Sequence, residues 1–402
     1  MANSIDVTCC VAGGGPAGLM LGYLLARAGV DVVVLEKHAD FLRDFRGDTI
    51  HPSTMEIMSK LGLLNEFLKL PHQPVPDISA QFGNEKIKIA DFSSLPVRAP
   101  YIAMMPQWDF LNFIAAKAQA FPSFRLMMQT EAIRLVIDGS RCLGVKARTP
   151  EGETTIRAQL VVAADGRDSA MRKSAGLEID DFGAPMDVLW FRLSRDPSDT
   201  METQGRFFAG GIMIMLNRGD YWQCAFVIPK GENKRVRAAG LEAFRNRLGP
   251  LLPFAASRTA ELQDWDQVKL LVVQVNRLKT WWQPHFLCIG DAAHAMSPVG
   301  GVGVNIAVQD AVAAANILVE PLRTGTLRDA HLEAVQKRRE WPAKATQFLQ
   351  LQMQKRVITA VLGSTVQPKP PMFLRLLAYF PIFRRLTARL IGMGVRPELP
   401  KI

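Results

Sequence analysis

The sequence predicts an α/β fold with three parts: a domain on a parallel β-sheet, an inserted domain on a mostly antiparallel β-sheet, and a C-terminal helical segment. Three observations support this. A short apolar run is followed by glycines, a helical pattern and a second apolar run within the first 36 residues. Continuously apolar runs, typical of buried parallel strands, recur later in the chain. Between residues 181 and 274, apolar and polar residues alternate, which is typical of antiparallel strands.

The first predicted unit is a strand, a helix and a second strand. Val7–Ala12 is the first strand, Leu19–Ala28 is the helix, which ends at Gly29, and residues 31–36 form the second strand. Such a crossover joins parallel neighbours, so a Rossmann-like βαβ unit is expected. The same patterns predict further strands at Leu160–Ala164 and Phe286–Ile289 and further helices at Thr54–Leu61, Phe110–Ala120 and Val304–Leu318.

Composition and charge narrow the functional classes. The 402 residues are 48% hydrophobic and 21% charged, which is typical of a globular protein. The formal charge of +10 comes almost entirely from the end of the chain, because Trp341–Pro397 holds nine bases and no acid, whereas residues 1–340 hold 38 bases and 37 acids. A near-neutral body argues against nucleic acid as a partner.

The cysteines and the N-terminus add two expectations. Five cysteines without C-x-x-C spacing predict neither a disulfide framework nor a zinc site. Cys9, Cys10 and Cys288 lie in apolar runs and are expected to be buried reduced thiols. No secretion signal and no unbroken apolar run of the roughly 18–20 residues needed to span a membrane are found. We therefore expect a cytoplasmic protein.

A glycine motif follows the first strand directly. Gly13, Gly15 and Gly18 have G-x-G-x-x-G spacing, with Pro16 and Ala17 opening the helix. The glycines permit a tight turn and close approach of backbone to a pyrophosphate, which the helix N-terminus then faces. Glu36 ends the second strand, where a carboxylate binds ribose hydroxyls and disfavours a 2′-phosphate. The pattern favours NAD or FAD over NADP as the bound dinucleotide.

Two later motifs distinguish between these cofactors. One strand ends in Asp165-Gly166, and another ends in Gly290-Asp291 and continues through Pro298 to Asn305. The three motifs occur in the same order, over about residues 5–320, as in a known family. In this the chain resembles the single-component FAD-dependent aromatic hydroxylases, the para-hydroxybenzoate hydroxylase-like flavoprotein monooxygenases. One departure is that family members often show Arg-x-Arg, whereas here Asp44 precedes Phe45-Arg46.

The resemblance implies roles for individual residues. It assigns the AMP end of FAD to the first glycines and Glu36, the ribityl chain to Asp291, both FAD and NAD(P)H to Asp165-Gly166, and the flavin ring to the backbone of the loop from Pro298. The full expected cofactor-binding set is Gly13, Gly15, Pro16, Ala17, Gly18, Glu36, Lys37, Arg46, Gln107, Asp165, Gly166, Gly290, Asp291, Pro298, Gly301, Gly303, Val304 and Asn305. No side chain is assigned as catalytic, and Pro298, Gly300 and Gly301 are expected to face the ring.

The resemblance also implies the reaction. NADPH or NADH reduces FAD transiently, O2 adds to give a C4a-hydroperoxide, and one oxygen enters an apolar or aromatic organic substrate. The alternatives are an FAD-dependent reductase or dehydrogenase acting on a prenyl or lipid-like substrate, and a non-catalytic, membrane-peripheral flavin-binding protein. The expected division is a discontinuous FAD-binding domain at 1–72, 101–180 and 275–340, a β-sheet substrate domain at 73–100 and 181–274, and a basic helical region at 341–402.

Two further features have two interpretations each. Residues of the antiparallel region are expected either to line an apolar substrate pocket or to be ordinary sheet core and surface: Arg192, Met213, Met215, Tyr221, Gln223 and Phe226. In the tail, Ile382, Leu386, Leu390 and Met393 share one helical face, and Arg385 and Arg389 share another. This helix either packs on the cofactor domain with its arginines outward or lies on an anionic membrane.

Overall fold

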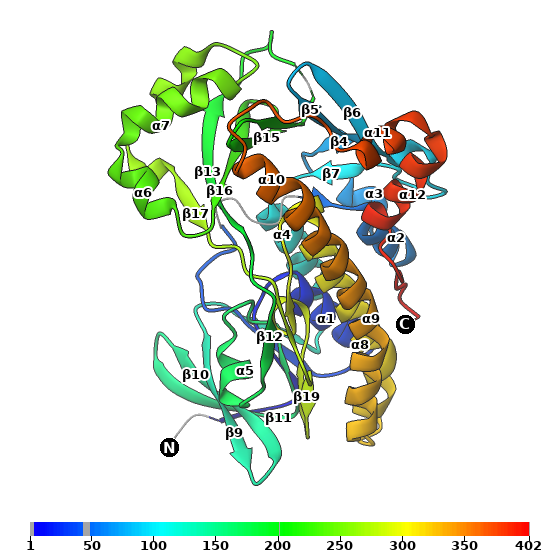
Figure 1. The fold of residues 1–402 in the computed structure, drawn as a ribbon. Helices are drawn as coiled ribbons and strands as arrows, with labels where there is room; N and C mark the ends of the chain where they lie inside the picture. The colour runs from blue at the N-terminus through cyan, green and yellow to red at the C-terminus, as the bar shows by residue number, and fades with distance from the viewer. Residues whose placement is uncertain (1–3, 43–48, 201, 402) are drawn as a thin grey trace.

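The computed structural model describes residues 4–42, 49–200 and 202–401. It contains two large β-sheets at opposite ends of the molecule, with long helices running alongside both (Figure 1). The α/β fold class predicted from the sequence is confirmed.

The first sheet has eight strands in the order β19-β20-β11-β1-β2-β8, with β10 and β9 attached antiparallel beyond β11. Its centre is parallel, since β1 pairs in parallel with β2 and β11, and β11 pairs in parallel with β20. The bounds are β1 Ser4–Ala12, β2 Val32–Leu35, β8 Phe124–Met127, β9 Glu131–Asp138, β10 Arg141–Thr149, β11 Gly152–Ala163, β19 Trp282–Gln283 and β20 Phe286–Cys288.

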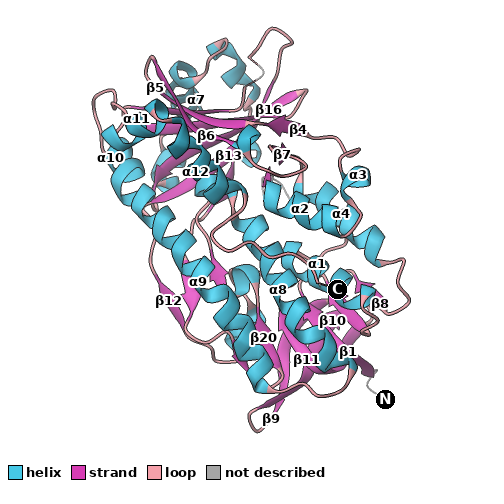
Figure 2. Ribbon diagram, turned by 90° about the vertical axis from the view of Figure 1, so that its right-hand side faces the viewer, coloured by secondary structure: helices cyan, strands magenta, loops and turns pink. Residues whose placement is uncertain are grey.

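Helices cover this sheet, and α1 packs between α8 and α4 (Figure 2). The bounds are α1 Pro16–Arg27, α2 Pro52–Lys60, α3 Leu64–Phe67, α4 Gln107–Ala118, α5 Ala170–Ser174, α8 Gly303–Arg323 and α9 Asp329–Met353. The helix α8 with its preceding turn, Val299–Arg323, is long and apolar enough to cross a membrane, but 83% of its most apolar window is buried inside the protein. It is therefore the central helix of the core.

The second sheet has seven strands in the order β17-β13-β16-β15-β14-β5-β6, antiparallel except where β14 meets β5. Strands from residues 77–91 thus join strands from residues 186–271. Their bounds are β5 Asp77–Phe82, β6 Glu85–Asp91, β13 Met186–Ser194, β14 Gln204–Phe208, β15 Gly211–Asn217, β16 Tyr221–Pro229 and β17 Lys269–Leu271. The remaining strands form two three-stranded sheets. One contains β3 Thr49–Ile50, β4 Gln73–Val75 and β7 Ile102–Met104, and the other contains β12 Ile179–Asp181, β18 Asn276–Leu278 and β21 His294–Ala295.

The two faces of the seven-stranded sheet are covered differently. One face packs on α7 Leu241–Leu248, which follows α6 Asn233–Ala238; this helical insertion was not expected from the alternating pattern. The other face packs on the π-helical turn η7 Gln354–Ile358 and on α10 Thr359–Leu362. Side chains on a strand alternate between the faces, so residue parity decides which cover each one meets.

The chain ends in a helical hairpin, α11 Met372–Tyr379 and α12 Pro381–Gly392. It packs on β6 and on the short helix η1 Phe92–Ser94, at the edge of the antiparallel sheet (Figure 1). This differs from the expected packing of the apolar face on the cofactor domain: Ala388 and Gly392 face inward, while Ile382 and Leu386 are exposed.

Candidate active site

The first glycine turn fits tightly against the second motif. Gly13 has φ +108°, and a Cβ on it would lie 2.4 Å from the Ala164 carbonyl oxygen. A Cβ on Gly18 would lie 1.9 Å from the Gly13 carbonyl oxygen. Neither position accepts a side chain, so these glycines bring the start of α1 down onto the turn that contains Asp165.

The space beyond this turn is open. A Cβ on Gly15 would meet nothing within 4 Å, and no side chain caps α1, which begins at Pro16. The first N–H groups of a helix have no partner within the helix, and together with its dipole they attract anions. This end of α1 therefore fits a pyrophosphate.

Glu36 lies beside the same turn, where β2 ends. One of its carboxylate oxygens accepts a hydrogen bond from the Gly14 N–H (3.1 Å), and the other contacts the His38 ring and accepts from the His38 N–H at 3.1 Å. The Glu36 side chain is only 12% exposed, whereas Lys37 next to it is exposed. A fixed carboxylate at the end of the second strand suits the hydroxyls of an adenosine ribose.

Asp165 supplies an unpartnered polar atom in this cradle. Its Oδ2 accepts a hydrogen bond from the Met171 N–H at 3.1 Å, while its Oδ1 is buried and has no partner among the described residues. Burial raises the pKa of Asp165. Gly166 follows with φ +87° and open space around it. A buried oxygen without a partner is costly, so its position beside the glycine turn fits a ligand that hydrogen-bonds to it.

The third motif joins both earlier ones. Gly290 has φ +60°, and a Cβ on it would lie 3.2 Å from the Ala17 Cβ and 3.3 Å from the Ala307 Cβ. Next to it, Asp291 forms an ion pair with Arg167 at 3.2 Å, in the second motif. Three motifs that are far apart in sequence thus meet at the N-terminal ends of α1 and α8.

Arg172 connects the second and third motifs through hydrogen bonds to backbone carbonyls. It is 5% exposed and donates hydrogen bonds to the Ala292 carbonyl (3.0 Å) and the Arg167 carbonyl (2.7 Å). Neither Arg167 nor Arg172 is among the predicted site residues. Their position two and seven residues after Asp165 was the one available signal.

Asp310, on α8, is a buried anion behind the third motif. It accepts hydrogen bonds from the Gly290 N–H (3.0 Å), His294 Nε2 (2.6 Å) and Arg339 Nε (2.8 Å), and it is fully buried. Burial alone would raise the pKa of Asp310, but His294 and Arg339 hold it below its usual value. His294 therefore has a buried partner in Asp310. Asp310 itself was not predicted.

The predicted ring-facing loop is the short helix η6 Val299–Gly301, which follows Pro298. A Cβ on Gly301, at φ +63°, would lie 2.5 Å from Thr49 Oγ1, which donates a hydrogen bond to the Gly301 carbonyl at 2.7 Å. α8 then begins at Gly303 and Val304 without a side-chain cap. Its free N–H groups and dipole are suited to stabilise negative charge on a ring placed there.

The Asn305 side chain hydrogen-bonds to other parts of the protein. Its Oδ1 accepts hydrogen bonds from the His51 N–H (2.8 Å) and Thr54 Oγ1 (2.7 Å), and its Nδ2 donates to the Thr49 carbonyl at 3.1 Å. These contacts hold the side chain within the protein, and the cofactor contact expected of Asn305 is one of its backbone.

Two further predicted residues remain, Arg46 and Gln107. Arg46 lies outside the described residues. Gln107 is the first residue of α4 and is half-buried, and the preceding strand β7 pairs with β3 through Met104 and Thr49. The cofactor loop, β3 and the start of α4 are thus neighbours.

The predicted substrate residues divide between the two faces of the seven-stranded sheet. Met213, Met215 and Phe226 are fully buried in the cluster under α7, which favours the second interpretation for them, ordinary sheet core. The opposite face carries Ile214 and Trp190, in the cluster against which Val299 of η6 packs.

By strand parity, the remaining three predicted residues share the face that carries Trp190. Arg192 is exposed and stacks on the Tyr221 ring at 4.9 Å, and the Gln223 amide oxygen accepts a hydrogen bond from Arg218 Nε at 3.1 Å. A shift of one residue along a strand moves each side chain to the opposite face of the sheet, so the alternating pattern did not determine which face lies toward the cofactor cradle.

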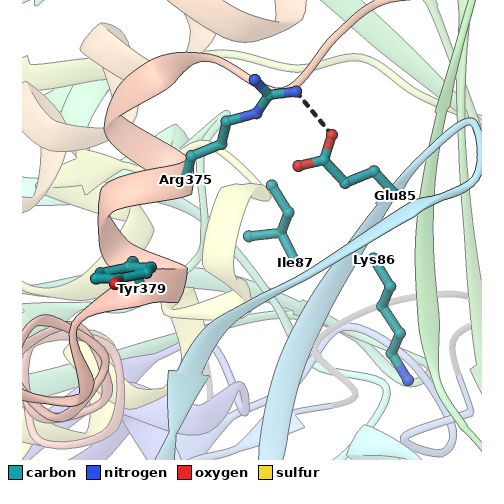
Figure 3. Close-up of a pocket in the computed structure, with 5 residues that line it drawn as sticks. All are labelled: Glu85, Lys86, Ile87, Arg375 and Tyr379. Carbon is teal, nitrogen blue, oxygen red and sulfur yellow. Dashed lines mark hydrogen bonds and ion pairs between the residues drawn. The ribbon is translucent and has the colours of Figure 1, made fainter.

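A cavity of about 450 Å³ lies elsewhere, between β6 and α11 (Figure 3). Its lining residues are Glu85, Lys86, Ile87, Arg375 and Tyr379. None of them belongs to the three motifs, so this cavity is separate from the cofactor cradle.

Comparison with known proteins agrees with this geometry. Residues 6–349 match the family model described as FAD binding domain. The chain is 30% identical over 404 residues to 6-methylpretetramide 4-monooxygenase of Streptomyces rimosus, covering 99% of this chain and 96% of that protein. It is 25% identical over 323 residues to para-nitrophenol 4-monooxygenase of Pseudomonas sp. (strain WBC-3), covering 78% of each.

A solved structure shows the same fold. The p-nitrophenol 4-monooxygenase PnpA from Pseudomonas putida DLL-E4 superposes with a TM-score of 0.78 at 23% identity, covering 98% of this chain and all of that one.

The fold and the cradle define a flavoprotein, and the chain belongs to the family of proteins with this FAD binding domain. Within that family it is an FAD-dependent monooxygenase, as the resemblance of its three motifs predicted.

Proposed function

We propose that FAD binds in the cradle formed by Gly13, Gly15, Glu36, Asp165 and Asp291, and that the enzyme hydroxylates a multi-ring phenol. The observation that carries the cradle is the convergence of three motifs, with Gly13 against Ala164 and Gly290 against Ala17. The open space at Gly15 and the unpartnered Asp165 Oδ1 support it as well.

When bound and reduced by NAD(P)H, FAD supplies the electrons with which O2 gives one oxygen atom to the substrate and the other to water. The chain's own residues bind, orient and shield. The N-terminus of α8 stabilises negative charge beside the ring. Trp190, Ile214 and Val299 all pack on the apolar cluster of one face of the seven-stranded sheet, and they would shield a substrate placed beside them from water.

The substrate class rests on two observations. On the sheet face that carries the cluster packed against Val299, Val188, Ile212, Ala225 and Val227 are apolar, and the Trp190 ring packs on them. This apolar part of the face suits a flat aromatic molecule. A relative that matches nearly the whole chain is named for 6-methylpretetramide, and two further relatives are named for tetracyclines, a name that denotes four rings. A fused-ring phenol therefore fits better than a small charged acid.

The reaction is tested with purified, FAD-loaded enzyme, NADPH or NADH and 18O2. We expect fused-ring phenols to stimulate NAD(P)H oxidation more than p-nitrophenol does, and the product to gain one 18O atom. Equal or faster turnover of p-nitrophenol would contradict the substrate class. A reduced product without 18O would instead support the reductase alternative.

The cradle is tested separately through Asp291→Ala. We expect this variant to purify with little FAD while keeping its circular dichroism spectrum. Asp168→Ala is the matched control, because Asp168 is an exposed aspartate that follows the second motif. Full FAD occupancy in Asp291→Ala would show that the cofactor does not depend on this carboxylate.

A further inference from the structure

The C-terminal hairpin, α11 and α12, concentrates exposed apolar side chains. Nine large apolar residues between positions 372 and 390 are exposed, against twelve in all the rest of the described chain. The nine are Met372, Phe373, Leu376, Tyr379, Phe380, Ile382, Phe383, Leu386 and Leu390. A cluster of this kind marks an interaction surface.

The hairpin is fixed to the protein by its other side. Leu374 is buried against β5 and β6, and Ala388 is buried against η1. A Cβ on Gly392 would lie 3.1 Å from the Phe92 ring, so the helix approaches η1 closely. Arg375 reaches from α11 to Glu85 on β6 and forms an ion pair at 2.8 Å (Figure 3). Leu374, the small residues Ala388 and Gly392, and an ion pair hold the hairpin, while nine other large apolar residues face outward.

The exposed face of α12 is also basic. Ile382, Leu386 and Leu390 are spaced by four residues and form one stripe, and Arg385 and Arg389 form an exposed stripe beside it. Neither arginine has an ion-pair partner among the described residues. Since residues 341–397 hold no acid, this segment itself offers the arginines no partner.

We propose that this hairpin docks on an anionic lipid surface. Outward apolar side chains beside arginines are the pattern of a helix that lies in a membrane interface, where anionic headgroups pair with the basic stripe. A second copy of the chain fits less well. Two hairpins face to face would bring their arginines together without an acid in the segment to neutralise them.

The docked hairpin is joined directly to the flavin-facing helix. His51 Nδ1 donates a hydrogen bond to the Ile391 carbonyl at 2.8 Å, and its backbone N–H donates to Asn305 on α8. Gln309, also on α8, donates to the Met393 carbonyl at 3.4 Å. Lipid docking would therefore hold the active-site end of α8 at the membrane, within reach of apolar substrates dissolved there.

The test uses the full-length, FAD-loaded protein and sedimentation with vesicles. We expect binding to phosphatidylcholine vesicles that contain phosphatidylglycerol, weak binding to pure phosphatidylcholine, and loss of binding as salt rises. Ile382→Ser/Leu386→Ser should lower the partition coefficient at least about tenfold, which corresponds to 1.4 kcal/mol. Arg385→Gln/Arg389→Gln should remove the preference for the anionic lipid.

The control is Phe348→Ser, an equally exposed apolar residue on α9 (59%), which should bind like the wild type. Absence of binding by the wild type, or equal binding by the Ile382→Ser/Leu386→Ser variant, overturns the proposal. A wild-type dimer in light scattering that becomes monomeric in this variant would assign the face to a second copy and overturn it too. Vesicle binding is measured without substrate, so its failure is distinct from failure of the proposed hydroxylation.

Discussion

Asp310 should be the residue on which the third motif depends most. It is fully buried and neutralises Arg339, whose side chain is 1% exposed, while it also binds the Gly290 N–H and His294. Asp310→Asn removes the charge and directs an N–H₂ group at a donor. Removing one partner of a buried ion pair costs about 3–5 kcal/mol. Because Arg339 keeps a second ion pair, with Glu398 at 3.5 Å, the lower end of this range is expected.

The variant is measured by thermal unfolding and by FAD titration. We expect the unfolding midpoint to fall by roughly 4 °C, which is about 3 kcal/mol divided by an unfolding entropy of about 0.8 kcal/mol per kelvin for 402 residues. FAD should also bind more weakly, because Asp310 fixes the N–H of Gly290 next to Asp291. Asp138→Asn, an exposed aspartate on β9, is the control and should change neither quantity. An Asp310→Asn protein with a wild-type midpoint and FAD affinity would refute the view that this buried anion supports the cofactor turn.

Three further predictions follow from single contacts. Gly13→Ala should unfold at a lower temperature and lose FAD, because its Cβ would clash with the Ala164 oxygen at 2.4 Å. Gly15→Ala should keep apo-protein stability and lose only FAD affinity, because its Cβ would meet nothing within 4 Å. Equal unfolding midpoints for the two variants would contradict this. Burial lowers the pKa of His51 from 6.5 to about 4, so the unfolded state binds a proton that the folded state does not as the pH falls from 6.5 to 4. Folding stability should fall by about 3 kcal/mol over this range. In urea titrations at each pH, His51→Gln should lose less stability than the wild type. Met213→Ala should cost about 2–5 kcal/mol of stability with KM unchanged, whereas Trp190→Ala should raise KM roughly tenfold in steady-state kinetics.

The sequence predicted much of the parallel-sheet domain because its signals are local. β1, α1 and β2 lie within a few residues of their predicted positions, and α2, α4 and α8 were also expected. The glycines of the first motif can be identified from spacing alone, since a turn with φ +108° at Gly13 demands glycine whatever surrounds it. The predicted residues missed Asp310 and Arg339, because a buried ion pair between two helices has no local pattern.

The sequence by itself determined the class of the protein: three ordered motifs, an α/β fold and an FAD-dependent monooxygenase. Only the tertiary structure decided which side of each strand and helix is covered by another element and which side is exposed to solvent. It assigned Met213 and Phe226 to the core under α7 and turned Ile382 and Leu386 outward. The physical reason is that periodicity gives the faces of an element, whereas burial depends on which other element covers each face.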